Sequence, residues 1–136
     1  MAPQLSAVVI HVLNIWQTCE WYRQVFGFVA AISPDAASAH FQVAGQSLIF
    51  VAHDAQEETF GPHRPNSFLA DPPAFHLDIT TTDVQSLFDH ALSHGAVPVL
   101  HPALNAQGQV VAGLRDLNGI LVQLIQFLPT NIQNKV

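Results

Sequence analysis

Residues 76–95, HLDITTTDVQSLFDHALSHG, contain the signals that decide the fold. The first five residues alternate between polar and apolar side chains, as in a strand with one buried face. Asp83 then precedes a helical pattern that continues to His94, and Gly95 follows it. Aspartate is a favoured first residue of a helix and glycine a favoured residue after its end. The stretch therefore predicts a strand at 74–80 and a helix from Asp83 to His94.

The same order of signals occurs near the N-terminus. Residues 5–13, LSAVVIHVL, are apolar and rich in β-branched side chains, which predicts a buried strand. Either Asn14 or Thr18 is a suitable cap for a helix that runs to about Phe26, and Gly27 follows that helix. Because both stretches lead from a strand through a helix to a glycine over almost the same length, we interpret them as an internal repeat.

Three further strands are expected after each helix. They fall at about 28–33, 38–44 and 47–53 in the first half, and at about 97–101, 109–115 and 120–127 in the second half. The polar, proline-rich residues 54–73 predict a connecting loop. The sequence therefore predicts an α+β fold in which one domain, 1–136, contains two βαβββ modules at 5–53 and 74–128.

Composition excludes several classes of function. Apolar residues make up 49 % of the chain and charged residues only 10 %, which supports a folded core and suggests a surface covered in part by a partner chain. We expect that partner to be a second copy in a homodimer. The net charge is −6 and the four basic residues are scattered, so we expect no nucleic-acid partner.

The lone cysteine and the N-terminal sequence indicate in which cellular compartment we expect the protein. Cys19 allows neither an internal disulfide nor a multi-cysteine zinc site. The first residues, MAPQLS, lack the basic start of a signal peptide, and no stretch has the length needed to span a bilayer. We therefore expect a soluble cytoplasmic protein with no membrane partner.

Alternation along the strands predicts which side chains share a face. In 75–80, His76 and Asp78 lie on the opposite face from the apolar residues between and beside them. In the last strand, Gln123 lies on the opposite face from the apolar residues immediately before and after it. His11 shares a face with Ala7 in the first strand. If the faces not covered by helices combine, they form a mostly apolar cavity with a few polar groups, which is typical of a small-molecule pocket. The expected ligand-binding residues are His11, Phe50, His76, Asp78 and Gln123.

Three stretches together resemble the glyoxalase, bleomycin-resistance and extradiol-dioxygenase superfamily, also called the vicinal oxygen chelate proteins. They are NIWQTCEWYRQVFGF at 14–28, HLDITTTDVQSLFDHALSHGA at 76–96, and RDLNGILVQL at 115–124. The resemblance covers residues 5 to 128. It implies paired βαβββ modules that form a curved mixed sheet around a cleft, often with the cleft shared between two subunits.

The resemblance also implies where a metal would bind in metal-dependent members, which use His and Glu ligands. The first-module positions fall on Ala7 and Phe50, and the second-module positions on His76 and Gln123. Methyl and phenyl groups supply no ligand atom, and a neutral amide is a poor replacement for a carboxylate. We therefore expect no tightly held metal and no other cofactor.

Two functions of different classes follow from the resemblance. The first is metal-independent binding or sequestration of a small aromatic or hydrophobic molecule, as in bleomycin-resistance-type proteins. The alternative is a metal-dependent lyase, isomerase or dioxygenase of the glyoxalase type; a metal-free enzyme with His76 as general base is a variant of it. A purely structural or interaction role is the third reading. The sequence names neither the ligand nor the arrangement of modules in a dimer.

Overall fold

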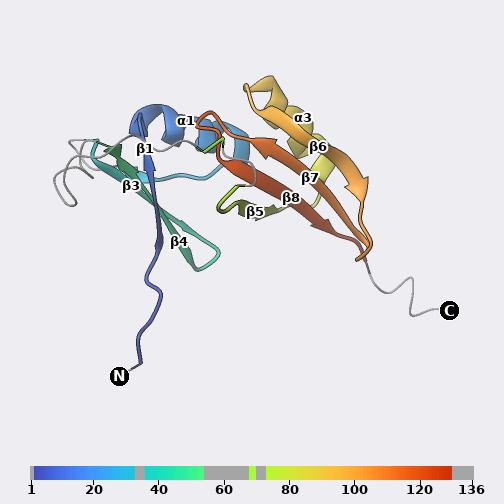
Figure 1. Ribbon diagram of the computed structural model, residues 1–136, viewed down its shortest axis with the longest axis horizontal. Coiled ribbons are helices and arrows are strands. Elements are labelled where there is room, and N and C mark those ends of the chain that lie inside the picture. Colours follow the sequence, from blue (N-terminus) through green and yellow to red (C-terminus); the bar gives the residue numbers. More distant parts are fainter. Residues whose placement is uncertain (1, 33–35, 54–67, 70–72, 130–136) are drawn as a thin grey trace. The chain divides into compact units, whose positions relative to one another are not determined.

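The computed structural model describes residues 2–32, 36–53, 68–69 and 73–129. The chain divides into two compact units, Met1–Ser67 and Phe68–Val136, which we call unit 1 and unit 2. Most of the predicted connecting loop at 54–73 lies outside the described residues. Figure 1 shows the elements of each unit in sequence colours.

Unit 1 contains one helix and a four-stranded sheet. Its elements in chain order are β1 (Val8–Val12), α1 (Ile15–Phe26), β2 (Ala31–Ile32), β3 (Ser38–Val43) and β4 (Gln46–Ala52). The strand order in the sheet is β1-β4-β3-β2. β1 is parallel to β4, and the other neighbours are antiparallel. The crossover from β1 through α1 to the sheet is what a parallel pair requires.

The ends of α1 are fixed by its flanking residues. The side chain of Asn14 accepts a hydrogen bond of 2.9 Å from the backbone N–H of Gln17, so Asn14 is the cap and Thr18 lies within the helix. Gly27 has φ 72° and donates its N–H to the carbonyl oxygen of Arg23 at 3.0 Å. That left-handed conformation is readily available only to glycine.

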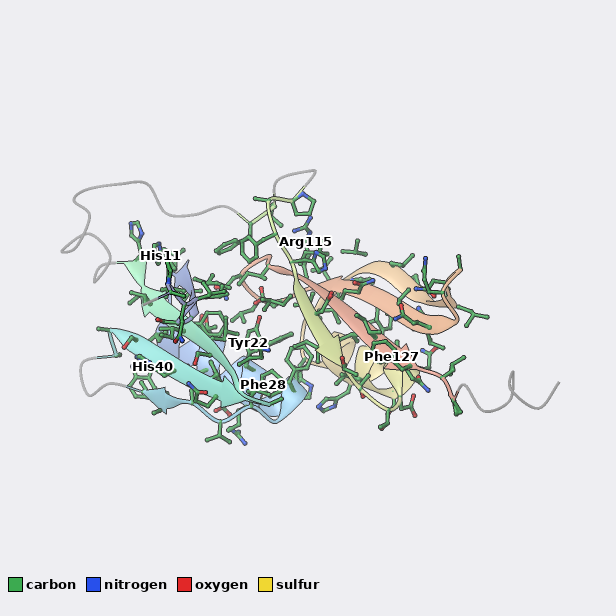
Figure 2. All side chains as sticks on the ribbon, turned by 90° about the horizontal axis from the view of Figure 1, so that it is seen from below. His11, Tyr22, Phe28, His40, Arg115 and Phe127 are labelled. Atoms are coloured by element: carbon green, nitrogen blue, oxygen red, sulfur yellow. The ribbon has the colours of Figure 1, made fainter. Side chains whose placement is uncertain are left out.

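The core of unit 1 is aromatic. The Tyr22 ring, on α1, lies 5.1 Å from the ring of Phe50 on β4, centroid to centroid. Phe50 in turn lies 5.5 Å from Phe41 on β3 with the rings nearly perpendicular. All three side chains are buried, and Figure 2 labels Tyr22 within unit 1. Such tilted and edge-to-face contacts add to the free energy gained from burying the rings.

Unit 2 repeats the arrangement. Its elements are β5 (Leu77–Thr80), α3 (Val84–Ser93), β6 (Val97–Leu104), β7 (Gln109–Arg115) and β8 (Leu121–Phe127). The strand order is β5-β8-β7-β6, again with one parallel pair, β5 with β8. Figure 1 shows α3 along one face of this sheet. The two βαβββ modules and the α+β class are thus confirmed.

The helix of unit 2 begins as the sequence predicts. The Asp83 side chain accepts a hydrogen bond of 3.0 Å from the N–H of Ser86. The N–H of Val84 donates at 3.0 Å to Oε1 of Gln126, which links the start of α3 to β8. The helix buries one side of its surface against the sheet. The buried side chains on the two sides of this core are Val84, Phe88 and Ala91 on α3, and Ala112, Leu114, Val122 and Leu124 on β7 and β8.

β6 is longer than predicted. The sequence places its end near His101, but the strand continues through Pro102 to Leu104. β6 is the outermost strand of its sheet, and an edge strand tolerates a proline because one side of its backbone needs no partner. Neither described helix is long and apolar enough to cross a membrane.

Candidate functional site

The candidate site lies on the face of the unit 2 sheet opposite α3, which we call the open face. Asp78 on β5 pairs with Gln123 on β8, and Gln123 pairs with Gly113 on β7. Gly113 pairs in turn with Leu100 on β6. Residues paired directly across neighbouring strands have side chains on the same face. We call Asp78, Gln123, Gly113 and Leu100 the open-face row.

A histidine and a carboxylate stand at one end of this row. Nε2 of His76, the residue before β5, lies 2.8 Å from Oδ1 of Asp78. The Asp78 side chain is 53 % exposed. A carboxylate has about four acceptor positions on its two oxygens, so the bond to His76 leaves Asp78 able to accept hydrogen bonds from a ligand. The pair also orients the imidazole ring.

Gly113 lies in the middle of the row and is buried, because residues of β6 approach its backbone closely. A Cβ atom built on Gly113 would lie 3.4 Å from Cβ of Leu100 and 3.7 Å from Cβ of Val99. Two residues of β6 oppose one of β7 here, because the register shifts between Pro98 and Leu100 as in a β-bulge. Val99 and Leu100 are 53 % and 49 % exposed. Two exposed apolar side chains therefore lie beside Gly113, and Gln123 is its pairing partner on the other side.

Arg115 lies on the open face next to the β7–β8 turn. Its Nη1 donates hydrogen bonds to the carbonyl oxygens of Phe68 at 2.6 Å and Gly119 at 2.8 Å. Figure 2 labels Arg115. The Leu69 side chain fills the space beside Gly119, because a Cβ there would lie 3.0 Å from a Leu69 methyl carbon. Arg115 and Gly119 thus bind residues 68–69 to the turn. In this position Arg115 has a structural role, because its hydrogen bonds hold these residues together.

Two of the five predicted site residues lie in unit 1, on opposite faces of its sheet. His11 pairs with Val51, while the preceding residue, Ile10, pairs with Phe50. His11 is half-buried, and Figure 2 labels it in unit 1.

The expectation that Phe50 shares an open face with His11 is wrong. Phe50 is 0 % exposed and contacts Tyr22 of α1, so it belongs to the core beneath the helix. The open-face residues of β4 are its neighbours Ile49 and Val51, which pair with Val9 and His11.

The other three predicted residues, His76, Asp78 and Gln123, come together on the open face of unit 2. Sequence reasoning missed Gly113, Val99 and Leu100. A signal for Gly113 was present, because a glycine inside a strand pattern often marks a bulge or a place where another group approaches the backbone.

The donor set of the row is a poor fit for a tightly held divalent metal. It supplies one imidazole, one carboxylate already bonded to that imidazole, and the neutral amide of Gln123. Stable sites for such metals combine several imidazole, thiolate or carboxylate ligands. Within the described parts of the chain, no three His, Cys, Asp or Glu side chains gather closely enough to hold a metal ion.

Comparison with known proteins identifies the fold. No family model and no curated protein matches the sequence. Among solved structures, a glyoxalase/bleomycin resistance protein/dioxygenase family enzyme from Burkholderia phytofirmans is similar with a TM-score of 0.74 and 23 % identity, over 93 % of this chain and 100 % of the other. A glyoxalase-related enzyme from Fulvimarina pelagi gives a TM-score of 0.76 and 13 % identity, over 92 % and 88 %.

A hypothetical protein from S. aureus gives a TM-score of 0.76 and 17 % identity, over 93 % of this chain and 95 % of the other. The chain therefore has the fold of the glyoxalase, bleomycin-resistance and dioxygenase proteins, and the predicted resemblance is confirmed at the level of the fold. Identities this low leave the activity to be argued from the site.

Proposed function

We propose that this protein binds a small aromatic or hydrophobic molecule without a metal ion, on the open face of unit 2. One observation supports this proposal above all others. The open-face row places the polar groups of Asp78 and Gln123 on the same sheet face as the exposed Leu100, with the exposed Val99 next to it. Apolar surface with a few orienting polar groups is the usual composition of a small-molecule site.

Gln123 is the residue that separates this proposal from metal catalysis. In the resemblance described above, its position is that of a ligand carboxylate in metal-dependent members. A neutral amide there removes a negative charge that a divalent cation needs, yet it still donates and accepts hydrogen bonds to an uncharged ligand. We further propose that the protein acts as a homodimer, in keeping with its low content of charged residues.

A second candidate function is a metal-dependent lyase, isomerase or dioxygenase. The observation that favours it is the 2.8 Å separation of His76 Nε2 and Asp78 Oδ1. Two ligands of one metal ion at about 2.1 Å each lie at a comparable distance from one another. That function would need a divalent metal to polarise the oxygen atoms of a substrate, at the positions that the resemblance assigns to His76 and Gln123.

A thermal-shift screen in the presence of a chelator tests the binding proposal. A ligand that binds only the folded protein stabilises it by about 2.7 kcal/mol at a concentration one hundred times Kd. Flat aromatic compounds are expected to raise Tm by several degrees with the chelator present. A Gln123→Leu variant should lose most of the shift, while Gln107→Leu, a change at an exposed turn position, should keep it.

Metal analysis separates the two candidates. Protein purified without chelator is expected to hold well under one equivalent of Mn, Fe, Ni or Zn. A stoichiometric metal content that His76→Ala abolishes, together with a thermal shift that appears only when that metal is present, would establish the second candidate instead.

A further inference from the structure

We propose that His90 and His94, at the C-terminal end of α3, form an exchangeable binding site for a divalent transition-metal ion, with Cu²⁺ preferred. The two residues are four apart in the sequence, and residues with that spacing lie on the same side of a helix. Their imidazole rings lie 4.5 Å apart, centroid to centroid. The pair belongs to the helix side of unit 2, so this site is separate from the open-face row and independent of the proposed function.

The separation of the two rings matches that of two neighbouring ligands of one metal ion. An imidazole nitrogen binds such an ion at about 2.0 Å and the ring centre lies about 1.2 Å behind it, so each centroid would be roughly 3.2 Å from the metal. Two such centroids are about 4.5 Å apart when the ligands make a right angle and about 5.2 Å apart at the tetrahedral angle. The observed 4.5 Å therefore favours the right angles of a tetragonal site, which are typical of Cu²⁺ and Ni²⁺.

Hydrogen bonds determine which nitrogen of His94 can bind the metal. Nδ1 of His94 lies 3.0 Å from the backbone carbonyl oxygen of His90 and 3.1 Å from Oγ of Ser93. Ser93 donates its one hydroxyl hydrogen to the same carbonyl oxygen at 2.6 Å. Because a carbonyl oxygen only accepts, Nδ1 carries the hydrogen, and the lone pair of the neutral ring is on Nε2. A hydrogen bond from the other ring nitrogen to a backbone carbonyl is a usual way of orienting a metal-binding histidine.

The surroundings of the pair favour a cation. His90 lies in the last turn of α3 and His94 directly follows the helix, where the backbone carbonyl groups carry a partial negative charge. The whole chain is acidic, with a net charge of −6. The His90 side chain is exposed and that of His94 is half-buried, so a hydrated ion can reach both rings from solvent.

The number of donors makes the site an exchangeable one. Within the described residues, no third His, Cys, Asp or Glu side chain joins the pair to form a three-donor cluster. Water therefore takes the other coordination positions, and binding is weaker than at a closed site with four protein ligands. Imidazole suits Cu²⁺, Ni²⁺ and Zn²⁺ but not Mg²⁺, and among divalent ions of the first transition row the affinity of a given site is highest for Cu²⁺.

Calorimetric titration of the metal-free full chain with Cu²⁺, Ni²⁺, Zn²⁺ and Mg²⁺ tests the proposal. We expect one Cu²⁺ per chain, weaker binding of Ni²⁺ and Zn²⁺, and no binding of Mg²⁺. Loss of a hydrogen-bond partner of a metal ligand already costs about 10–100-fold in affinity, so His90→Ala and His94→Ala should each weaken Cu²⁺ binding by at least about tenfold. Electron paramagnetic resonance of bound Cu²⁺ should show coupling to two nitrogen nuclei in the wild type and to one in either variant.

Two other histidine variants are the controls. His40→Ala removes an exposed imidazole from unit 1, and His76→Ala removes the imidazole beside the open-face row; both should leave Cu²⁺ binding unchanged. Thermal unfolding would show that the His90 and His94 variants are folded. Absence of Cu²⁺ binding to the wild type, unchanged affinity in the folded His90→Ala or His94→Ala protein, or loss of binding in His76→Ala would each overturn the proposal. None of these results bears on binding of an aromatic molecule to chelator-treated protein, so the proposed function is tested separately.

Discussion

Replacing Phe50 with alanine distinguishes a core residue from a pocket residue. Phe50 is 0 % exposed, and its ring contacts Tyr22 and Phe41 at centroid distances of 5.1 and 5.5 Å. Replacing a buried phenylalanine by alanine removes its burial and leaves a cavity, at a cost of roughly 3–5 kcal/mol. Domains of this size unfold at about 5–15 kcal/mol, so Phe50→Ala should forfeit a large part of the stability of unit 1.

Tryptophan fluorescence during urea unfolding is the assay. Both tryptophans, Trp16 and Trp21, lie in α1, so their emission reports on unit 1 alone. With a urea slope of about 2 kcal/mol per molar, the midpoint should fall by roughly 2 M. Val9→Ala is the control, because Val9 is on the other face and 47 % exposed; it should cost under about 1 kcal/mol. A loss below about 1 kcal/mol for Phe50→Ala would refute the assignment of faces.

Three further changes have expected outcomes. Asp116→Ala should lower the free energy of unfolding by about 2–3 kcal/mol in urea titrations followed by circular dichroism, because the buried carboxylate accepts the N–H groups of Asn118 at 2.8 Å and Ile120 at 2.9 Å; an effect below about 0.5 kcal/mol would contradict this. Asn14→Ala should cost about 1 kcal/mol through loss of the α1 cap, measured by Tm, and an unchanged Tm would argue against that cap. Burial raises the pKa of the Cys19 thiol to about 11 from an ordinary value near 9, so the folded state holds this proton more tightly. The associated stability is present below pH 9 and is lost as the pH rises to 11, and Cys19→Ala should make the pH dependence of unfolding flatter over that window.

The helices could be predicted from sequence because their ends are coded locally. Asp83 and Gly95 mark one helix and Asn14 and Gly27 the other, and each acts within a few residues of its own position. The choice between Asn14 and Thr18 needed the structure, since both residue types are good caps. The repeat of these signals was enough to indicate two βαβββ modules.

The faces of β4 could not be predicted from sequence. Residues 48–52, LIFVA, are apolar at every position, so alternation gives no indication of which side faces the helix. A shift of one residue reverses every side chain in a strand. The pairing register of β4 with β1 determines which face of β4 is buried, because Ile10 and Phe50 are paired and both are buried. Such pairing depends on contacts between residues far apart in the sequence.

The faces of the last strand, β8, were easier to predict, because Gln123 lies among apolar residues and its polarity indicates the open face. The bulge in β6 was beyond sequence reasoning, since Val99 and Leu100 lie between two prolines, Pro98 and Pro102, on an edge strand. Only the register showed that both oppose Gly113. The grouping of polar and exposed apolar side chains on the open face is therefore a product of strand pairing.

Calorimetric titration of the chelator-treated protein with a flat aromatic probe such as naphthalenemethanol, repeated after addition of one equivalent of Mn²⁺, Ni²⁺ or Zn²⁺, tests metal-independent binding most directly. Because the open-face row offers a neutral amide where a metal ligand would be needed, we expect saturable binding at one probe per chain with the same Kd in every condition. Binding that is absent from the chelated protein and restored by one of the metals would contradict the account.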